Sequence, residues 1–149
     1  MHSEPVTQQK PLDLSPIVGQ IVDRSNSENM LCYGDFNWKT FRSNHKVSIE
    51  SFKDSIIGGE RASPSDLVVS VDYLHTVGML RIGEVLDDLR RVTRRIGFFH
   101  VKTDSEIEDL RAVDKPNAWW ISEFMKRFEL QTFQRVPYGF YVIVYAKAN

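Results

Sequence analysis

Residues 66–75 read Asp-Leu-Val-Val-Ser-Val-Asp-Tyr-Leu-His, and this stretch decides how the rest of the chain is interpreted. The run Leu67–Val71 is almost continuously apolar, which is typical of a parallel strand whose sheet is covered on both faces. It is followed at once by Asp72, and ligands gather at the carboxyl ends of such strands in open α/β sheets. Because a strand of this kind needs helices on both sides, the stretch predicts an α/β protein.

The chain after this strand alternates between helical and extended patterns. Apolar residues at helical spacing predict a helix over Ile82–Arg95, with acids in its first turns and arginines in its last, as the helix dipole favours. Gly97 is expected to end this helix and Phe98–Val101 to form the next strand. Pro116 and Asn117 are expected to start a further helix.

Two more strands, Glu129–Arg135 and Phe140–Ala146, follow that helix, and the tight connection over residues 137–139 predicts an antiparallel hairpin. Upstream, Asn29–Tyr33 and Lys46–Phe52 are further strand candidates. Together these elements predict an α/β fold: a three-layer Rossmann-like sandwich with a mostly parallel sheet and a C-terminal antiparallel hairpin.

The beginning of the chain is expected to contain one short helix over Ser15–Arg24. The Ser15 side chain is expected to cap it, and Pro16 suits its first turn. Residues 1–14 are predicted to be a loose N-terminal arm, and residues 15–149 a single domain.

Composition excludes several classes of protein. Of the 149 residues, 42% are hydrophobic and 26% charged, and 19 Lys and Arg nearly balance 20 Asp and Glu. The net charge is therefore close to zero and does not attract the chain to nucleic acid or to an anionic membrane. No apolar run approaches the ~20 residues that span a bilayer. Cys32 is the single cysteine, and no His, Asp or Glu cluster has the spacing of metal ligands. We expect no metal and a cytoplasmic protein without a membrane partner.

The order of these features resembles that of class I S-adenosylmethionine (SAM)-dependent methyltransferases, particularly the small ones often carried by phages. Residues 66–75 look like the family's fourth strand, usually an apolar run that ends in Asp-x-Leu-Glu-His. Further segments similar to the family are Val85–Thr93, Gly97–Phe99, Trp119–Ile121 and Phe128–Leu130. The resemblance implies a SAM cofactor, a transferred methyl group and, for a phage protein, the host cytoplasm.

The family's cofactor loop, of the form Leu-Asp-x-Gly-x-Gly-x-Gly, falls on Met30–Trp38 and is degenerate there. Gly34 is the one glycine that remains, and Phe36 and Trp38 stand where the next two belong. Loop glycines let backbone N–H groups approach a ligand without a Cβ in the way. The two rings are therefore expected to fill the space of the methionine part of SAM, which predicts weakened or lost SAM binding.

The resemblance also assigns the site residues. Gly34, Asp35, Asp54 and Asp72 are implied to bind the cofactor, with Asp54 at the ribose, and Asp72 and His75 to face the transferred methyl group. Each assignment has a structural alternative: Asp54 as a solvated acid at a strand end, Asp72 as a turn residue, and His75 as a structural histidine. His100 lies inside a predicted strand and is expected to be a hydrogen-bonded sheet residue.

Three functions follow as alternatives. The first is a methyltransferase-like protein with an unidentified methyl acceptor, and the second is a non-catalytic binding or assembly module that keeps the fold. The second would use a protein partner or a second copy of the chain. The hairpin aromatics are candidates for that interface: Tyr138, Phe140, Tyr141 and Tyr145. The third is a nucleotide or nucleic-acid contact through a group of basic residues. The structural alternative, which we expect, is that these residues are a solvated helix end. They are Arg90, Arg91, Arg94 and Arg95, with Lys126 and Arg127 on another helix.

Overall fold

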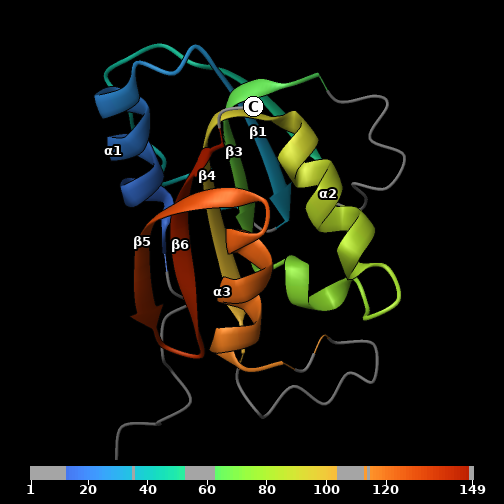
Figure 1. Ribbon diagram of the computed structural model, residues 1–149. Helices are drawn as coiled ribbons and strands as arrows, with labels where there is room; N and C mark the ends of the chain where they lie inside the picture. The colour runs from blue at the N-terminus through green and yellow to red at the C-terminus, as the bar shows by residue number, and fades with distance from the viewer. Residues whose placement is uncertain (1–12, 35, 53–62, 104–112, 114, 148–149) are drawn as a thin grey trace, which may run out of the picture.

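The computed structural model describes residues 13–34, 36–52, 63–103, 113 and 115–147. They form one six-stranded sheet with the strand order β2-β1-β3-β4-β6-β5 (Figure 1). The strands are β1 (Asn29–Gly34), β2 (Ser48–Phe52), β3 (Ser65–Val71), β4 (Thr93–Lys102), β5 (Phe128–Val136) and β6 (Gly139–Ala146). The helices are α1 (Ser15–Ser25), α2 (Ile82–Val92) and α3 (Asn117–Met125), with a 3-10 turn, η2, over Leu74–Thr76.

The sheet is mostly parallel. β1 pairs in parallel with β2 and β3, and β3 pairs in parallel with β4. β6 is antiparallel to both β4 and β5, so β5 runs in the same direction as the first four strands. The prediction of a parallel sheet closed by an antiparallel hairpin is confirmed, and its turn places Tyr138 at a φ of 66°.

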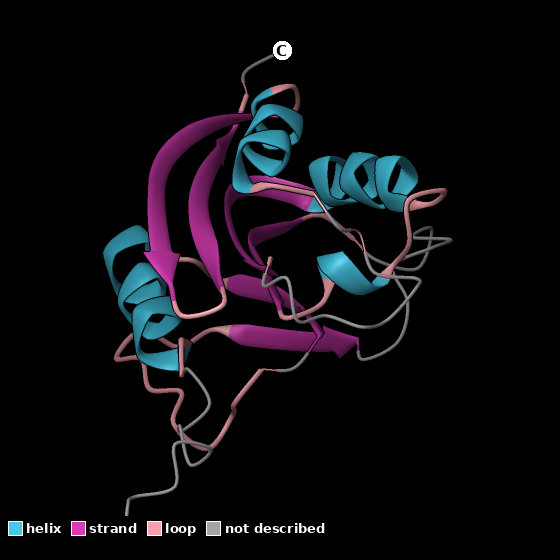
Figure 2. Cartoon of the chain, turned by 90° about the horizontal axis from the view of Figure 1, so that it is seen from below, coloured by secondary structure: helices cyan, strands magenta, loops and turns pink. Residues whose placement is uncertain are grey.

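Helices cover both faces of the sheet, which makes three layers (Figure 2). One face carries α1, whose Val18 and Val22 pack with Met30, Leu67 and Val69. The other face carries α2 and α3, whose buried side chains pack against the alternate residues of the same strands. This explains the continuous apolar run of β3: every residue in it is buried, because successive side chains point into opposite cores.

The passage from α2 to β4 differs from the prediction. The helix ends at Val92 rather than Arg95, and β4 begins at the very next residue, Thr93, with an extended backbone. Both the backbone N–H and the hydroxyl of Thr93 donate to the Leu89 carbonyl, the hydroxyl at 2.6 Å, which completes the last turn without a glycine. Gly97 therefore lies within a strand, where a side chain would collide with the Phe99 ring.

The start of α1 also differs from the prediction. Its first residue is Ser15, preceded by the N-cap residue Leu14, and the Ser15 side chain does not cap it; the Asp13 carboxylate accepts the Ser15 N–H at 3.1 Å. The Ser15 hydroxyl instead donates to the Asn37 carbonyl at 2.8 Å, which fastens the helix to the loop after β1. Pro16 lies in the first turn, as predicted. No helix in the described part of the chain is long and apolar enough to cross a bilayer.

Candidate functional site

The carboxyl ends of β1 and β3 lie side by side in the middle of the sheet. From β1 the chain goes on to β2 on one side, and β3 lies on the other side, so the strand order reverses between them. Such a switch point is where open α/β sheets bind ligands, because the loops from the two strands leave in opposite directions. The register pairs Gly34 with Val71, which puts two predicted site residues, Gly34 and Asp72, next to each other.

Gly34 has a structural reason of its own to be glycine. Its φ is +87°, in the left-handed region, and a Cβ there would overlap the Val71 carbonyl oxygen and come within 2.7 Å of the Tyr73 Cβ. An L side chain disfavours this backbone conformation even before the overlap. The close approach that Gly34 permits is therefore to the end of β3.

The loop after β1 packs against α1. Phe36 is buried in the core of the α1 face, and its ring centroid lies 4.5 Å from that of Trp38 and 5.7 Å from that of Phe41. Residues 36–47 form turns and no helix. In dinucleotide-type sites the helix after the first strand binds the ligand's phosphates with its N-terminus. Because residues 36–47 form no helix, this segment has no such N-terminus. That the rings fill the methionine space of SAM stays a prediction.

Asp72, His75 and His100 form a polar group at this edge, which we call the carboxyl-edge cluster. Asp72 follows β3 with a φ of 53°, and its backbone N–H donates to the His100 Nδ1 at 3.1 Å across to β4. The His75 Nε2 lies 3.6 Å from the Asp72 Oδ1. The Asp72 side chain is 43% exposed and that of His75 only 8%, so Asp72 is the member that a ligand would meet first.

His100 joins the cluster through its ring. Because Nδ1 accepts the Asp72 N–H, the neutral ring carries its proton on Nε2. Burial lowers the pKa of His100, an effect that the nearby Asp72 carboxylate partly opposes. The prediction of a hydrogen-bonded sheet histidine is confirmed. Its link to Asp72 was not predicted, since the two residues are 28 positions apart.

The 3-10 turn η2 holds His75 in place. The Val113 N–H donates to the His75 carbonyl at 2.7 Å, and the Thr76 hydroxyl donates to the Tyr73 carbonyl at 2.6 Å. Asp72 is thus the exposed member of the predicted pair, and His75 is the buried one.

Three aromatic rings line the same edge on the α2 side. Tyr33 stacks on Phe52 at a centroid distance of 5.5 Å and on Tyr73 at 6.5 Å, which links β1, β2 and the segment after β3. Tyr33 is fully buried, and burial raises the pKa of its phenol well above its usual range. Phe52 and Tyr73 are only partly buried. Sequence reasoning missed this row, because its members come from three separate segments.

Two predicted site residues, Asp35 and Asp54, lie outside the described residues. Among the residues that are described, no group of three His, Cys, Asp or Glu side chains is arranged to hold a metal ion.

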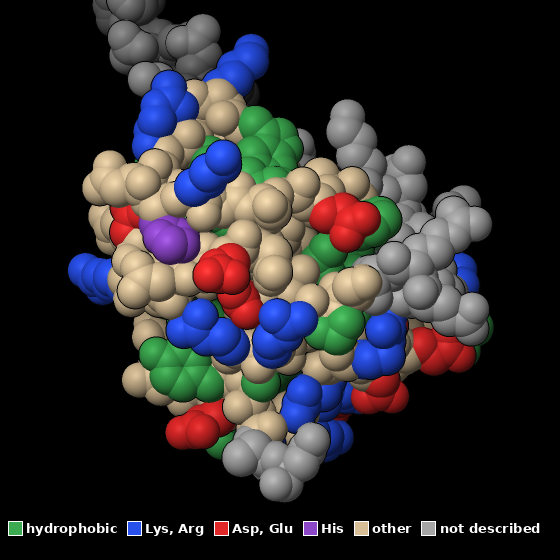
Figure 3. Space-filling view, turned by 90° about the horizontal axis from the view of Figure 1, so that it is seen from above, with side chains coloured by type: hydrophobic (Ala, Val, Ile, Leu, Met, Phe, Trp, Pro, Cys, Tyr) green, Lys and Arg blue, Asp and Glu red, His purple; other side chains and the backbone are tan. Residues whose placement is uncertain are grey.

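The basic residues do not form the arginine-rich helix end that the sequence predicted, because Arg94 and Arg95 belong to β4. The others have protein partners: Arg90 with the Lys147 carbonyl, Arg91 with Asp88, Lys126 with Glu123, and Arg127 with both Asp87 and Glu123. Figure 3 shows the edge of the molecule at the amino ends of the parallel strands, where basic side chains are interspersed with acidic ones. This is the pattern of a solvated protein surface.

Comparison with known proteins gives a likeness of fold without a likeness of sequence. No protein-family model matches the chain, and a search of curated proteins finds no match. An O-methyltransferase family protein from Burkholderia thailandensis superposes with a TM-score of 0.64 at 9% identity, over 91% of this chain and 57% of that chain. The N-methyltransferase NodS from Bradyrhizobium japonicum, in complex with S-adenosylhomocysteine (SAH), gives 0.63 at 13% identity, over 89% and 85%.

A SAM-dependent methyltransferase from Methanosarcina mazei gives a TM-score of 0.62 at 11% identity, over 93% of this chain and 100% of that chain. This chain spans 57% of the Burkholderia protein and 61% of PigF, another similar structure, which was solved with SAH. Identities this low bear on architecture alone. The chain has the Rossmann-like α/β fold of the SAM-dependent methyltransferases.

Proposed function

We propose that this chain is a methyltransferase-like protein with a weakened SAM site at the carboxyl edge, between β1 and β3. One observation carries the proposal: Gly34 and Asp72 meet at the switch point of the sheet, while residues 36–47 after β1 form no helix. The switch point is where this kind of sheet binds ligands, which supports the location. The single glycine supports a loss of affinity, and so does the missing helix N-terminus, which could otherwise face the one anionic group of SAM, its methionine carboxylate.

The described residues suit the nucleoside end of SAM better than its methionine end. The exposed Asp72 carboxylate can accept hydrogen bonds from hydroxyl or amino groups, and the partly buried Tyr73 and Phe52 rings lie at the same edge. The methionine end carries a charged amino group and a carboxylate, which need polar partners when they leave water. The buried Phe36 ring supplies none. Within the proposal, Asp35 and Asp54 complete the cofactor contacts.

In a catalytic version of this site, SAM would supply a methyl group on a positively charged sulfur, ready for attack by a nucleophile. The chain's own part would be to orient the acceptor and to receive its proton. Within the proposal the Asp72 carboxylate would receive the proton, and the His75 Nε2, 3.6 Å from the Asp72 Oδ1, supports this role. These residues do not specify which acceptor is methylated.

Calorimetric titration of the protein with SAH and SAM tests the proposal. If each aromatic ring in place of a loop glycine removes one backbone hydrogen bond of about 1–1.5 kcal/mol, binding weakens roughly 30- to 150-fold relative to an intact loop. A low-micromolar Kd then becomes about 0.1–1 mM, which is the value that we expect. Asp72→Asn should weaken it roughly another tenfold, because a bond to a charged group is lost. The matched control Glu84→Gln, on the surface of α2, should have no effect. A low-micromolar Kd contradicts a weakened site, and the absence of heat at millimolar SAH contradicts SAM binding.

The second candidate is a non-catalytic binding or assembly module. The packing of Phe36 and Trp38 into one ring cluster favours it, since rings where ligand-cradling glycines were expected suit a site with no cofactor to hold. Of the predicted interface aromatics, Tyr138 is 51% and Tyr145 40% exposed, whereas Phe140 is buried in the core and is excluded. Sedimentation velocity between about 5 and 200 µM separates the candidates: a mass that stays monomeric argues against self-assembly, and a dimer lost in Tyr145→Ser supports it.

A further inference from the structure

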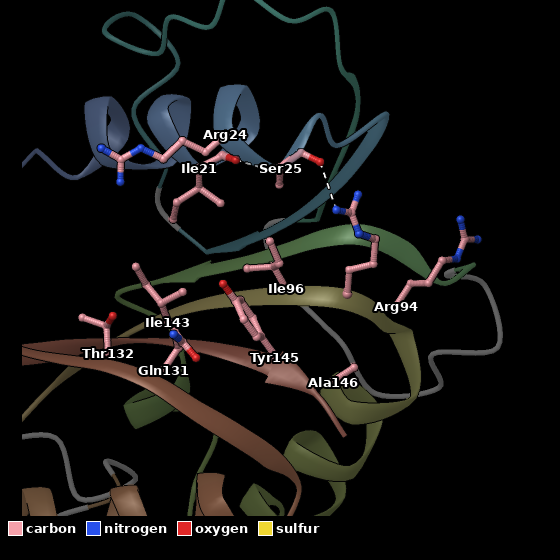
Figure 4. Close-up of a pocket in the computed structure, with 11 residues that line it drawn as sticks. Ile21, Arg24, Ser25, Arg94, Ile96, Gln131, Thr132, Ile143, Tyr145 and Ala146 are labelled. Carbon is pink, nitrogen blue, oxygen red and sulfur yellow. Dashed lines mark hydrogen bonds between the residues drawn. The ribbon is translucent and has the colours of Figure 1, made fainter. Parts of the chain in front are cut away.

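A cavity of about 720 Å³ lies at the edge of the sheet opposite the carboxyl-edge cluster (Figure 4). Its roof is the C-terminal half of α1, and its floor consists of the start of β4 and the paired strands β5 and β6. We call it the arginine groove, after the lining residues Arg24, Arg94 and Arg95. No residue of the proposed SAM site lines it.

The floor of the groove carries both apolar and polar side chains, and the polar ones are Gln131 and Thr132 of β5. Ile96, Ile143 and Tyr145 rise from the strands toward α1, and Ile21 faces them from the helix (Figure 4). Tyr145, the next-to-last residue of β6, is 40% exposed although it is paired on both sides, with Ile96 of β4 and Glu129 of β5. Contiguous apolar side chains under an open mouth, rimmed by polar ones, are typical of a ligand site.

The charge at the groove has one sign, since three arginines line it and no acid does. The Arg95 Nη2 donates to the Ser25 carbonyl at 3.0 Å, so this side chain spans from β4 to α1 and its guanidinium is held beside the mouth. Arg24 and Arg94 extend in opposite directions from the mouth in Figure 4. Arg94 has an acid close by, with its Nη1 3.4 Å from the Asp66 Oδ1, whereas Arg24 has no bonded acceptor among the described residues.

These features point to one kind of occupant. A guanidinium remains charged at any physiological pH and presents a planar fork that matches phosphate and carboxylate oxygens. The volume lies within the roughly 300–1,000 Å³ of small-molecule sites, which favours a small molecule over a macromolecule. The apolar part of the floor, formed by Ile96, Ile143 and Tyr145, suits a ring or chain that gains free energy from leaving water.

We propose that the arginine groove binds a small apolar or aromatic molecule that carries one phosphate or carboxylate. The apolar part lies on Ile96, Ile143 and the Tyr145 ring. The anionic group pairs with the Arg95 guanidinium, which the Ser25 carbonyl has already positioned. Arg24 and Arg94 flank the mouth and raise the local concentration of anions. This site is separate from the SAM site and does not depend on it.

The test uses the full chain with 1-naphthyl phosphate and 1-naphthoate as anionic probes and 1-naphthol as the neutral one, each followed by calorimetry and by NMR shifts. We expect both anions to bind at least tenfold more tightly than 1-naphthol, and to do so equally well in the presence of 2 mM SAH. Arg95→Gln should weaken the anions at least fivefold. The Arg95 change also removes the hydrogen bond to the Ser25 carbonyl and could act through the fold, so a second variant is needed. Arg24→Gln breaks no bond within the described residues. It should weaken the binding of both anions two- to threefold and leave the Tm unchanged.

Arg135→Gln, an exposed arginine of β5 outside the groove, is the matched control and should leave the affinities unchanged. The proposal is overturned if neither anion binds at 2 mM, if 1-naphthol binds as tightly as the anions, or if both groove variants bind like the wild type. Displacement of 1-naphthyl phosphate by a ten-residue polyglutamate of higher affinity would overturn the small-molecule assignment in favour of an acidic polypeptide.

Discussion

Replacement of Gly34 by alanine should destabilise the whole domain, whether or not a cofactor binds. At a φ of +87° the new methyl group would overlap the Val71 carbonyl oxygen and lie 2.7 Å from the Tyr73 Cβ. The left-handed backbone costs a non-glycine residue about 1–2 kcal/mol, and a forced overlap in a packed site typically costs about 1–3 kcal/mol more. The obstacle is the backbone carbonyl of Val71, the last residue of β3, which pairs with Gly34 at the end of β1, so its freedom to move is limited.

The expected loss is therefore about 2–5 kcal/mol, a large part of the roughly 5–15 kcal/mol that stabilises a domain. For a chain of this size it corresponds to a Tm lowered by about 5–15 °C. Urea unfolding followed by circular dichroism measures the loss directly. The assay is run without SAM or SAH, so that a contribution from binding cannot enter.

The matched control is the same substitution at Gly83 in α2, where a Cβ would meet no atom within 4 Å. Alanine there should stabilise the protein by about 0.5–1 kcal/mol, because it is the better helix former. Two chemically identical changes are thus expected to act in opposite directions. If Gly34→Ala unfolds within 0.5 kcal/mol of the wild type, the reasoning is refuted, and Gly34 is kept for a ligand rather than for the fold.

Three further changes probe other parts of the structure. Thr93→Val keeps the shape of the side chain but removes its 2.6 Å bond to the Leu89 carbonyl, and should cost about 0.5–1.5 kcal/mol in urea unfolding; an unchanged midpoint would show that the bond contributes nothing. Phe99→Ala removes a buried ring that lies 5.4 Å from two others, and should cost about 3–5 kcal/mol; a loss below 1 kcal/mol would contradict the packing described. Burial lowers the pKa of His100 in the folded state, so at acidic pH the unfolded chain binds more protons than the folded one. The free energy of unfolding should therefore be highest above the ordinary pKa of 6.5 and should fall as the pH drops below that value. Unfolding midpoints from pH 7.5 to 5 should show this decline in the wild type and a smaller one in His100→Gln; equal slopes would exclude His100, whose Nδ1 accepts the Asp72 N–H, as its source.

Periodicity was sufficient to predict the architecture of this fold, because hydrophobic burial dominates where an element is covered on both faces. The run Leu67–Val71 predicted a buried strand and the helical spacing after Ile82 predicted a helix, and the structure has both. The end of that helix could not be read in the same way. Arg94 and Arg95 continue a charge pattern that suits a helix C-terminus. The bonds of Thr93 to the Leu89 carbonyl, four residues back, also occur within helices, so a threonine at this position does not mark the helix end in the sequence.

The candidate site was predictable only in part. The positions of Gly34 and Asp72 at strand ends follow from the pattern, and the structure places them side by side. The reason for Gly34 does not follow from the pattern, since the carbonyl that requires it comes from a strand 37 positions further on. The participation of His100 depends likewise on strand register, which no local sequence signal carries.

The direct passage from α2 into β4 bears on how the domain folds. β3, α2 and β4 form one continuous segment, from Ser65 to Lys102, in which helix and second strand are joined without a single intervening residue. Contacts within such a unit close short loops, and chains tend to form low-separation contacts before distant ones. β1 and β2 must then dock onto β3 from outside this unit, and the hairpin onto β4. We therefore expect the β3–α2–β4 unit to nucleate folding, and its amides to gain protection first in pulsed hydrogen exchange.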